Sequence, residues 1–359
     1  MHVLQLIDSL SIGGAERMSV NIGNALQENG HHVILIATRK DGPLTKMLSK
    51  GVVFRSLEKK SAIDVFAFLR FITILYKERI EIIHAHSSSI YWAILGKVFK
   101  PRMKIIWHDH YGFSEILKDS DRKLIKYISP LFYGVIVVNT NLENWALRNI
   151  KVTKEKIVFL NNFPVLPKFT PKKEEEELTI VCIANLRLQK DHPTLVKALK
   201  KLKNQTTKKF RLILAGKFYN DDYYQEVCGL IEELELQEVI NIAGPIDNTA
   251  ELLAIADIGI LSSISEGLSV SLLEYGLAKL AVVVTNVGQC SEVVLHGKAG
   301  LVVQPKDENA IADALLKYID DPELISDMGE KLYTNVLENY SSEAFLKAYY
   351  KLLDVYEDK

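Results

Sequence analysis

Three absences narrow the class of protein that this sequence can encode. Its 359 residues include only three cysteines, which lie far apart and form no CxxC pair (Cys182, Cys228 and Cys290). Neither a disulfide framework nor a cysteine-ligated zinc site is therefore expected, and a reducing compartment is indicated. No stretch has the roughly eighteen uncharged apolar residues of a membrane span. The first residues lack the basic start and cleavage site of a signal peptide, so we expect a cytoplasmic protein.

The chain has the composition of an ordinary globular protein but an uneven distribution of charge. Hydrophobic residues make up 48% and charged residues 25%, which excludes disordered and fibrous classes. Residues 1–168 carry 24 basic and 14 acidic side chains, whereas the rest of the chain carries 20 and 31. A basic first half favours an anionic partner, although chance variation between domains is the alternative. Nucleic acid is not expected as that partner, because no motif that reads RNA or DNA is present.

Short runs of valine, isoleucine and leucine alternate with helical stretches along the chain. Runs of this kind are typical of strands that are buried on both faces of a parallel sheet. The predicted strands span residues 2–8, 32–39, 52–58, 81–86, 104–110, 134–139, 156–162, 179–184, 211–215, 239–243, 258–262, 281–285 and 301–303. We therefore predict an α/β protein with two Rossmann-like, doubly wound domains.

The alternation of strands and helices stops once, between residues 161 and 178. Three prolines and a KKEEEE run in this segment are typical of a linker. We place an N-terminal domain at 1–165 and a C-terminal domain at 166–340. The last segment, 341–359, has an apolar stripe at helical spacing, and it can pack on either domain.

Two groups of polar or small residues follow predicted strands in the first half. Gly13 and Gly14 precede a helix, where backbone amides can approach an anion, or they form a turn without a ligand. Their surroundings match neither GxGxxG nor a P-loop. The second group is two HxH pairs, formed by His84, His86, His108 and His110. These histidines can contact a ligand or pack internally, and without nearby acids or cysteines a metal site is not expected.

Charged residues follow two predicted strands of the second half. Arg187 and Lys190 can neutralise a diphosphate, or they are solvated loop cations. Glu266 lies on a loop and Glu274 lies in the next helix, where carboxylates can accept hydrogen bonds from vicinal hydroxyls. We expect Ser269 to cap that helix. The amides at the start of the helix fit a phosphate, and they belong to Leu268, Ser269 and Val270.

In this order, the motifs resemble the retaining, nucleotide-sugar-dependent glycosyltransferases of GT-B architecture, specifically family 4 (glycosyl transferases group 1). The resemblance covers nearly the whole chain. It rests on GGAE, on HDH, on NLRLQKDHPTL, on the E-x7-E spacing and on TNVGQCSEVVLHGKAGLVV. It departs from the family at Glu274-Tyr275, where alanine usually follows the glutamate, and at residues 279–281, which replace Gly-x-Pro. Both departures bear on nucleotide preference.

The resemblance implies a role for each candidate residue. Arg187 and Lys190 would clamp the donor diphosphate, Glu274 would hold the ribose, and Glu266 would hold sugar hydroxyls. His108 would contact the sugar near the reacting carbon. Gly13 and Gly14 would line the phosphate and acceptor side, and the helix within 341–359 would cross back to the N-terminal domain. The reaction would be retaining transfer of a hexosyl group to a hydroxyl, without an enzyme nucleophile.

The resemblance also implies the partners. They are a nucleotide-sugar donor and a glycan or lipid-linked acceptor of bacterial surface polysaccharide or glycolipid synthesis, with no metal and no other cofactor. Asp119-Ser120-Asp121 matches the metal-binding DxD pattern, but its position favours helix capping. A nucleotide-sugar epimerase is the alternative function. Cations interleaved with aromatic and apolar residues favour peripheral contact with an anionic membrane surface. These cations are Lys97, Lys100, Arg102, Lys104, Lys118, Arg122, Lys123 and Lys126.

Overall fold

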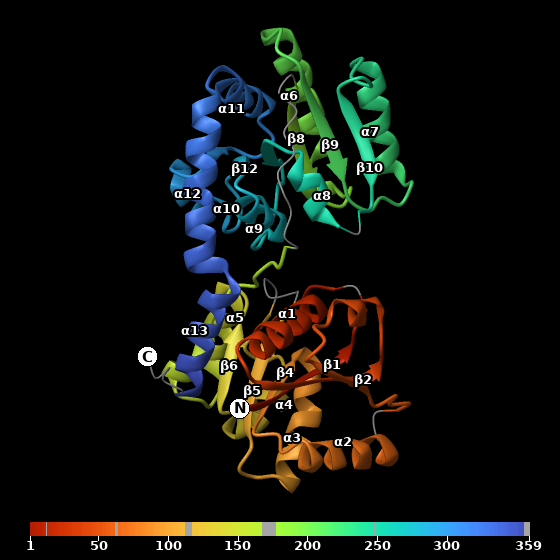
Figure 1. Cartoon of the computed structure of the whole chain (residues 1–359), viewed down its shortest axis with the longest axis vertical. Coiled ribbons are helices and arrows are strands. Elements are labelled where there is room, and N and C mark those ends of the chain that lie inside the picture. Colours follow the sequence, from red (N-terminus) through yellow and green to blue (C-terminus); the bar gives the residue numbers. More distant parts are fainter. Residues whose placement is uncertain (12, 62–63, 112–116, 167–176, 247, 355–359) are drawn as a thin grey trace. The chain divides into compact units, whose positions relative to one another are not determined.

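The structure of the chain is a computed structural model that describes residues 1–11, 13–61, 64–111, 117–166, 177–246 and 248–354. The described residues form two compact units (Figure 1). Unit 1 comprises Met1–Phe163 and Ser342–Lys359, and unit 2 comprises Pro164–Ser341. Most of the predicted linker, residues 167–176, lies outside the described part of the chain.

Unit 1 is built on a parallel sheet with strand order β3-β2-β1-β4-β5-β6-β7. Its strands are β1 (His2–Ser9), β2 (His32–Lys40), β3 (Val53–Ser56), β4 (Ile82–His86), β5 (Lys104–Asp109), β6 (Gly134–Val137) and β7 (Ile157–Phe159). The chain winds outward from β1 in one direction and then restarts at β4 in the other. Ligands of doubly wound folds bind at the carboxyl ends of strands at such a switch point.

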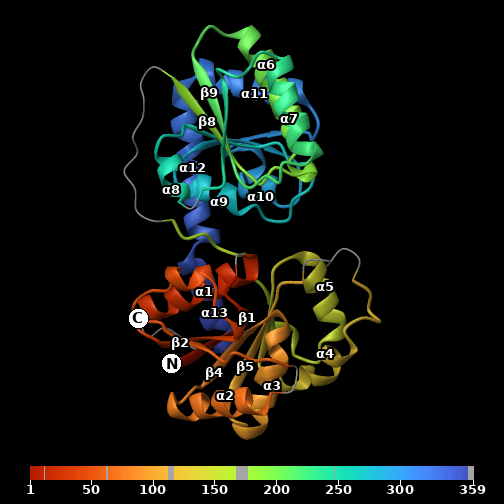
Figure 2. The same ribbon diagram turned by 90° about the vertical axis from the view of Figure 1, so that its right-hand side faces the viewer.

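Helices cover both faces of the sheet in unit 1 (Figure 2). On one face lie α1 (Gly14–Glu28) and α13 (Ser342–Leu353), whose buried side chains pack in one core. On the other face lie α2 (Val65–Lys77), α3 (Ile90–Phe99), α4 (Lys123–Ile128) and α5 (Thr140–Asn149). The last helix of the chain therefore completes the core of the unit that contains the first strand.

Unit 2 repeats this plan with a parallel sheet of order β10-β9-β8-β11-β12-β13. Its strands are β8 (Leu178–Ile183), β9 (Phe210–Ala215), β10 (Ile240–Gly244), β11 (Ile258–Leu261), β12 (Ala281–Thr285) and β13 (Leu301–Val303). The switch point lies between β8 and β11. Every strand predicted from the sequence is present in the two sheets, and the α/β doubly wound class is confirmed.

The helices of unit 2 also form two layers. One face carries α6 (His192–Gln205), α7 (Asp222–Glu233) and α11 (Glu308–Asp320). The other carries α8 (Thr249–Ala254), α9 (Val270–Leu277) and α10 (Cys290–Val293), while α12 (Pro322–Tyr340) contributes to both cores. Among the helices of the described residues, none combines the length and the apolar character that a bilayer crossing requires.

Candidate active site

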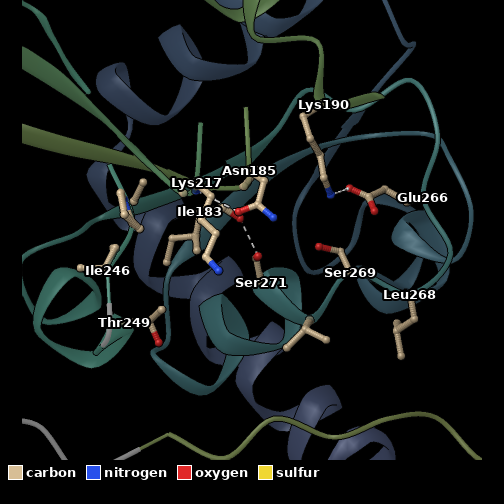
Figure 3. A pocket seen from close by; sticks show the side chains of 15 residues that line it. Ile183, Asn185, Lys190, Lys217, Ile246, Thr249, Glu266, Leu268, Ser269 and Ser271 are labelled. Carbon is tan, nitrogen blue, oxygen red and sulfur yellow. Dashed lines mark hydrogen bonds and ion pairs between the residues drawn. The ribbon is translucent and has the colours of Figure 1, made fainter. Parts of the chain in front are cut away.

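A cavity of about 400 Å³ lies at the carboxyl ends of the central strands of unit 2 (Figure 3). Its walls come from the segments that follow β8, β9, β10 and β11, so the cavity spans the switch point of the sheet. Its lining comprises Ile183, Ala184, Asn185, Lys190, Ala215, Gly216, Lys217, Pro245, Ile246, Thr249, Glu266 and Leu268–Ser271.

The charged centre of the cavity is an ion pair between Lys190 and Glu266. The Lys190 Nζ atom lies 2.5 Å from Oε1 of Glu266, and the two side chains are only 24% and 10% exposed. The hydroxyl of Ser263 donates a second hydrogen bond to the same oxygen, at 2.7 Å. Figure 3 shows the lysine and the glutamate pointing toward one another from two different loops. A cation and a carboxylate are thus held together at the carboxyl ends of the strands.

Hydrogen bonds between the two loops fix this pair in place. The amide of Ile264 donates to the carbonyl of Gln189 at 2.8 Å. The hydroxyl of Ser262 donates to the carbonyl of Lys190 at 2.7 Å. Because the first bond joins the two backbones and the second joins the Ser262 side chain to the Lys190 backbone, the geometry of the pair does not depend on the two long side chains alone.

Gly288 packs against the backbone of the Glu266 loop, a contact that was not predicted although Gly288 belongs to the TNVGQCSE motif. Its φ is +52°, and a Cβ atom there would lie 2.3 Å from the carbonyl oxygens of both Glu266 and Gly267. The next amide, of Gln289, donates to the carbonyl of Gly267 at 3.0 Å. Only glycine allows this close approach at positive φ.

Replacing Gly288 by alanine is therefore expected to destabilise unit 2 by at least about 2 kcal/mol and to lower transfer activity, because the Glu266 loop must move. Thermal unfolding followed by circular dichroism measures the first effect. Gly229→Ala in α7 is the matched control, since nothing lies within 4 Å of a Cβ atom there. An alanine at 288 that leaves both stability and activity unchanged would contradict the assigned support.

The N-terminus of α9 forms one wall of the cavity. Leu268, Ser269 and Val270 line it, and a phosphate contact of their amides stays a prediction. Ser269 occupies the N-cap position, but its side chain makes no capping hydrogen bond, so the predicted side-chain cap is wrong. Instead the neighbouring Ser271 hydroxyl anchors the helix by donating to the carbonyl of Ile183 at 2.6 Å.

Two of the site residues predicted in unit 2 do not line this cavity. Arg187 is exposed on the loop that leads to Lys190. Glu274 lies one turn into α9 and is only 5% exposed. The neighbouring Tyr275, a departure from the family pattern, is fully buried. Its hydroxyl accepts a hydrogen bond from the Ile183 amide at 2.7 Å, and its burial raises the pKa of the phenol.

The sequence analysis missed the side of the cavity that follows β9 and β10. Gly216, Lys217, Ile246 and Thr249 all line it. The backbone amide of Lys217, after β9, donates to Oδ1 of Asn185, after the paired strand β8, at 2.9 Å. Attention to the residues after the predicted strands 211–215 and 239–243 would have found this wall.

The four histidines of the HxH pairs form one stacked cluster in unit 1. The Nε2 atom of His84 lies 3.0 Å from Nδ1 of His108, and Nδ1 of His86 lies 3.1 Å from Nε2 of His110. The ring of Tyr349, from α13, stacks on His84 with centroids 5.4 Å apart. Burial lowers the pKa of His84 and of His110 to about 3, so the cluster is neutral at pH 7.

The predicted direct contact between His108 and substrate is not compatible with this packing. His108 is completely buried, and a ring of α13, that of Phe345, stacks over it. His110 follows the strand by one residue and is partly exposed. Its partner His86 faces Oε1 of Gln5 at 2.8 Å through Nε2. A proton on that nitrogen leaves Nδ1 of His86 as the acceptor, which makes His110 the donor in their bond.

Three histidines of this cluster offer one nitrogen atom each, which is the number of protein ligands in a three-histidine metal site. Ligand atoms of His84, His86 and His108 all lie within 4.8 Å of one another. Two of these residues, however, hydrogen-bond to each other, and the third bonds to Gln5. These bonds engage Nε2 of His84 and Nδ1 of His108, whereas Nδ1 of His84 and Nε2 of His108 have no hydrogen-bond partner in the described part of the chain.

The remaining candidates of unit 1 lie at helix starts. Gly13 is the N-cap of α1, with extended backbone and no side-chain cap, and nothing lies within 4 Å of a Cβ atom at Gly14. The predicted capping role of the DxD segment is wrong, because α4 begins at Lys123. Asp121 instead accepts from the Lys118 amide at 2.9 Å, and Asp119 pairs with Arg148 at 3.3 Å.

Two doubly wound α/β units, with a charged cavity at the switch point of the second, define the architecture of GT-B glycosyltransferases. Two family models match consecutive parts of the chain: Glycosyltransferase Family 4 over residues 12–163 and Glycosyl transferases group 1 over residues 167–334. The chain belongs to this glycosyltransferase family and is a hexosyltransferase.

Several named proteins are similar over most of their length. An N-acetyl-alpha-D-glucosaminyl L-malate synthase of Bacillus anthracis is 25% identical, and the match covers 94% of this chain and 93% of that protein. A capsular polysaccharide biosynthesis glycosyltransferase of Staphylococcus aureus is 22% identical, over 82% of this chain and 83% of that protein.

Solved structures show the same fold at lower identity. A glycosyltransferase from Rickettsia africae superposes with a TM-score of 0.76 at 21% identity, covering 100% of this chain and 99% of that one. The Anabaena HepE protein, solved in complex with UDP, superposes with a TM-score of 0.77 at 17% identity, covering 99% and 100%.

Proposed function

We propose that this glycosyltransferase moves a hexosyl group, with retention of configuration, from a nucleotide diphosphate sugar to a hydroxyl of a glycan or lipid-linked acceptor in bacterial surface glycan synthesis. The observation that carries the proposal is the Lys190–Glu266 pair at the cavity of unit 2. Relatives support the pathway: one is named for capsular polysaccharide synthesis, and another, from Campylobacter jejuni, for transfer to a diphospho-undecaprenol acceptor.

The cavity offers complementary groups for each part of such a donor. The Lys190 ammonium would neutralise the charge that develops on the departing diphosphate. The amides at the start of α9 would hold a phosphate beside Ser269. Glu266 would accept hydrogen bonds from sugar hydroxyls, and Ile246 would flank the planar base. Charge stabilisation by fixed protein groups requires no divalent metal, and the proposal includes none.

Four further assignments remain part of the proposal. Arg187 is the second cation of the same loop, and Glu274 is the ribose ligand behind the α9 wall. In unit 1, His110 takes the sugar contact that we first assigned to His108, because it is the partly exposed member of the cluster. Gly13 and Gly14, at the start of α1, would line the phosphate and acceptor side of the site.

Retention is proposed through attack on the same face from which the diphosphate departs. A two-step mechanism needs a second carboxylate placed as a nucleophile. Among the residues that line the cavity, Glu266 is the carboxylate, and Lys190 and Ser263 already engage it. The acceptor hydroxyl would pass its proton to the departing phosphate. The epimerase alternative is not favoured, because the named relatives are transferases.

A thermal-shift screen with UDP-, GDP-, ADP- and CMP-sugars tests the donor assignment. Ligand that binds only the folded state stabilises it by about 2.7 kcal/mol at one hundred times Kd, so one nucleotide class should raise Tm by several degrees. Incubation with that donor, followed by product analysis with and without a hydroxyl acceptor, separates transfer from epimerisation. A protein whose Tm responds to none of the four classes would contradict the proposal.

A further inference from the structure

Two neighbouring helices of unit 1, α2 and α3, are apolar on the side that faces solvent as well as on the side that faces the sheet. In α2, Ala67, Phe71 and Leu75 are buried in the core. The opposite stripe includes Phe66 and Leu69, which are 76% and 56% exposed. Helices with apolar residues all round occur in protein interiors or at membranes, not on ordinary wetted surfaces.

The exposed stripe of α3 continues this surface. Leu95, Val98 and Phe99 are 49%, 68% and 52% exposed, and they follow one another at helical spacing. A groove of about 320 Å³ runs between the two helices, with Phe68 and Trp92 in its wall. We call the exposed side of α2 and α3, with this groove, the α2–α3 face.

Helix α1, on the opposite face of the same sheet, carries no such exposed apolar stripe. None of the described residues of α1 is an exposed large hydrophobic residue, and its outer positions are polar, for example Glu16, Asn24 and Glu28. Contiguous apolar surface that gathers on neighbouring elements marks an interaction site, whereas single exposed apolar residues are ordinary.

The charges of α2 and α3 indicate what that partner is. Between them the two helices contain Arg70, Lys77 and Lys97 and no aspartate or glutamate. Asp64, which precedes α2, accepts hydrogen bonds from the amides of Ala67 and Lys60. Asp64 also lines the groove, so the face holds one carboxylate, which these amides engage, against the three cations of its helices. An apolar surface with an excess of cations complements an anionic lipid layer.

The cations predicted from the sequence to contact a membrane are for the most part turned inward. Lys97 donates to the carbonyl of Pro101 at 3.0 Å, and Lys100 donates to that of Ile80 at 2.5 Å. Lys104 bonds to the carbonyl of Leu353, and Arg122 pairs with Asp109 at 2.6 Å. Charge in this stretch therefore cannot carry membrane attachment alone, and apolar contact has to supply the larger part.

We propose that the α2–α3 face docks on an anionic lipid bilayer, with Phe66, Leu69, Val98 and Phe99 entering the boundary between headgroups and acyl chains. Lys77, the last residue of α2, is exposed and adds a cation to this face. The inference rests on the proposed function only in that a lipid-linked acceptor would give the docking a purpose. The contact itself depends on the surface of unit 1.

Vesicle flotation with the full chain tests the docking. The wild-type protein is expected to float with vesicles of phosphatidylcholine containing phosphatidylglycerol, and less with pure phosphatidylcholine or in high salt. The double variant Phe66→Ser/Val98→Ser should lower the partition coefficient at least about tenfold, because two apolar side chains no longer enter the lipid. The matched control is Leu295→Ser/Leu337→Ser, which changes two exposed apolar residues of unit 2 and should bind as the wild type does.

Three outcomes would overturn the inference. They are the absence of wild-type flotation with anionic vesicles, equal flotation of wild type and Phe66→Ser/Val98→Ser, and a dimer in solution that this variant converts to monomer without any vesicle binding. Transfer to a water-soluble acceptor is measured on the same preparations. Lost flotation with retained transfer supports the docking surface, whereas flotation without transfer by the wild type would count against the proposed function alone.

Discussion

Replacing Lys190 by alanine is expected to lower kcat by about a hundredfold to a thousandfold, with a smaller effect on KM. The ammonium lines the cavity of unit 2, where by the proposed mechanism it would face the charge that grows on the departing diphosphate. Removing one preorganised group of this kind costs about 2.7–4 kcal/mol of transition-state stabilisation. The variant also leaves Glu266 without its cation, which adds repulsion toward the phosphates.

Initial-rate kinetics with saturating donor and a hydroxyl acceptor measure this effect. Lys331→Ala is the matched control, because Lys331 forms a lysine–carboxylate pair in the same unit, with Asp327 at 2.5 Å and on an exposed surface. Its kcat should stay within about twofold, since exposed pairs contribute at most about 1 kcal/mol. Wild-type kcat in Lys190→Ala would rule out the assigned charge role. Arg187→Ala, on the same loop, tests whether both cations act on the diphosphate.

The sheets could be predicted from the sequence because their strands are buried on both faces. The strand β12, for example, has the sequence AVVVT and is buried throughout. A short run of this kind is typical of a strand inside a parallel sheet. The sequence could not give the end of each strand to one residue. This limit mattered at β5, which was predicted to end at residue 110 but ends at Asp109. His108 therefore lies within the buried strand, and His110 follows it.

The features of the site that could not be predicted depend on contacts between residues that are distant in the sequence. His108 is covered by Phe345, which belongs to the final helix, so its burial has no local signature. Gly216 and Ile246 reach the cavity through the pairing of β8, β9 and β10. Lys190 and Glu266, by contrast, follow the two strands at the switch point, and a doubly wound fold places such residues together.

Lowering the pH from 7 to 5 is expected to destabilise unit 1 by about 2 kcal/mol for each of His84 and His110. Burial lowers the pKa of both rings from 6.5 to about 3 in the folded protein. Because the unfolded chain binds the protons first, stability is complete above pH 6.5 and is lost progressively as the pH falls toward 3. Aspartate and glutamate contribute little between pH 7 and 5, since they titrate mainly below this range.

Urea unfolding followed by tryptophan fluorescence reports on unit 1 alone, because all three tryptophans of the chain, Trp92, Trp107 and Trp145, belong to it. His84→Gln should reduce the loss between pH 7 and pH 5 by about 2 kcal/mol, whatever its stability at pH 7. The control His296→Gln changes an exposed histidine of unit 2 and should leave that loss as it is. Equal stability of the wild type at both pH values would show that the histidine cluster is not held neutral by burial.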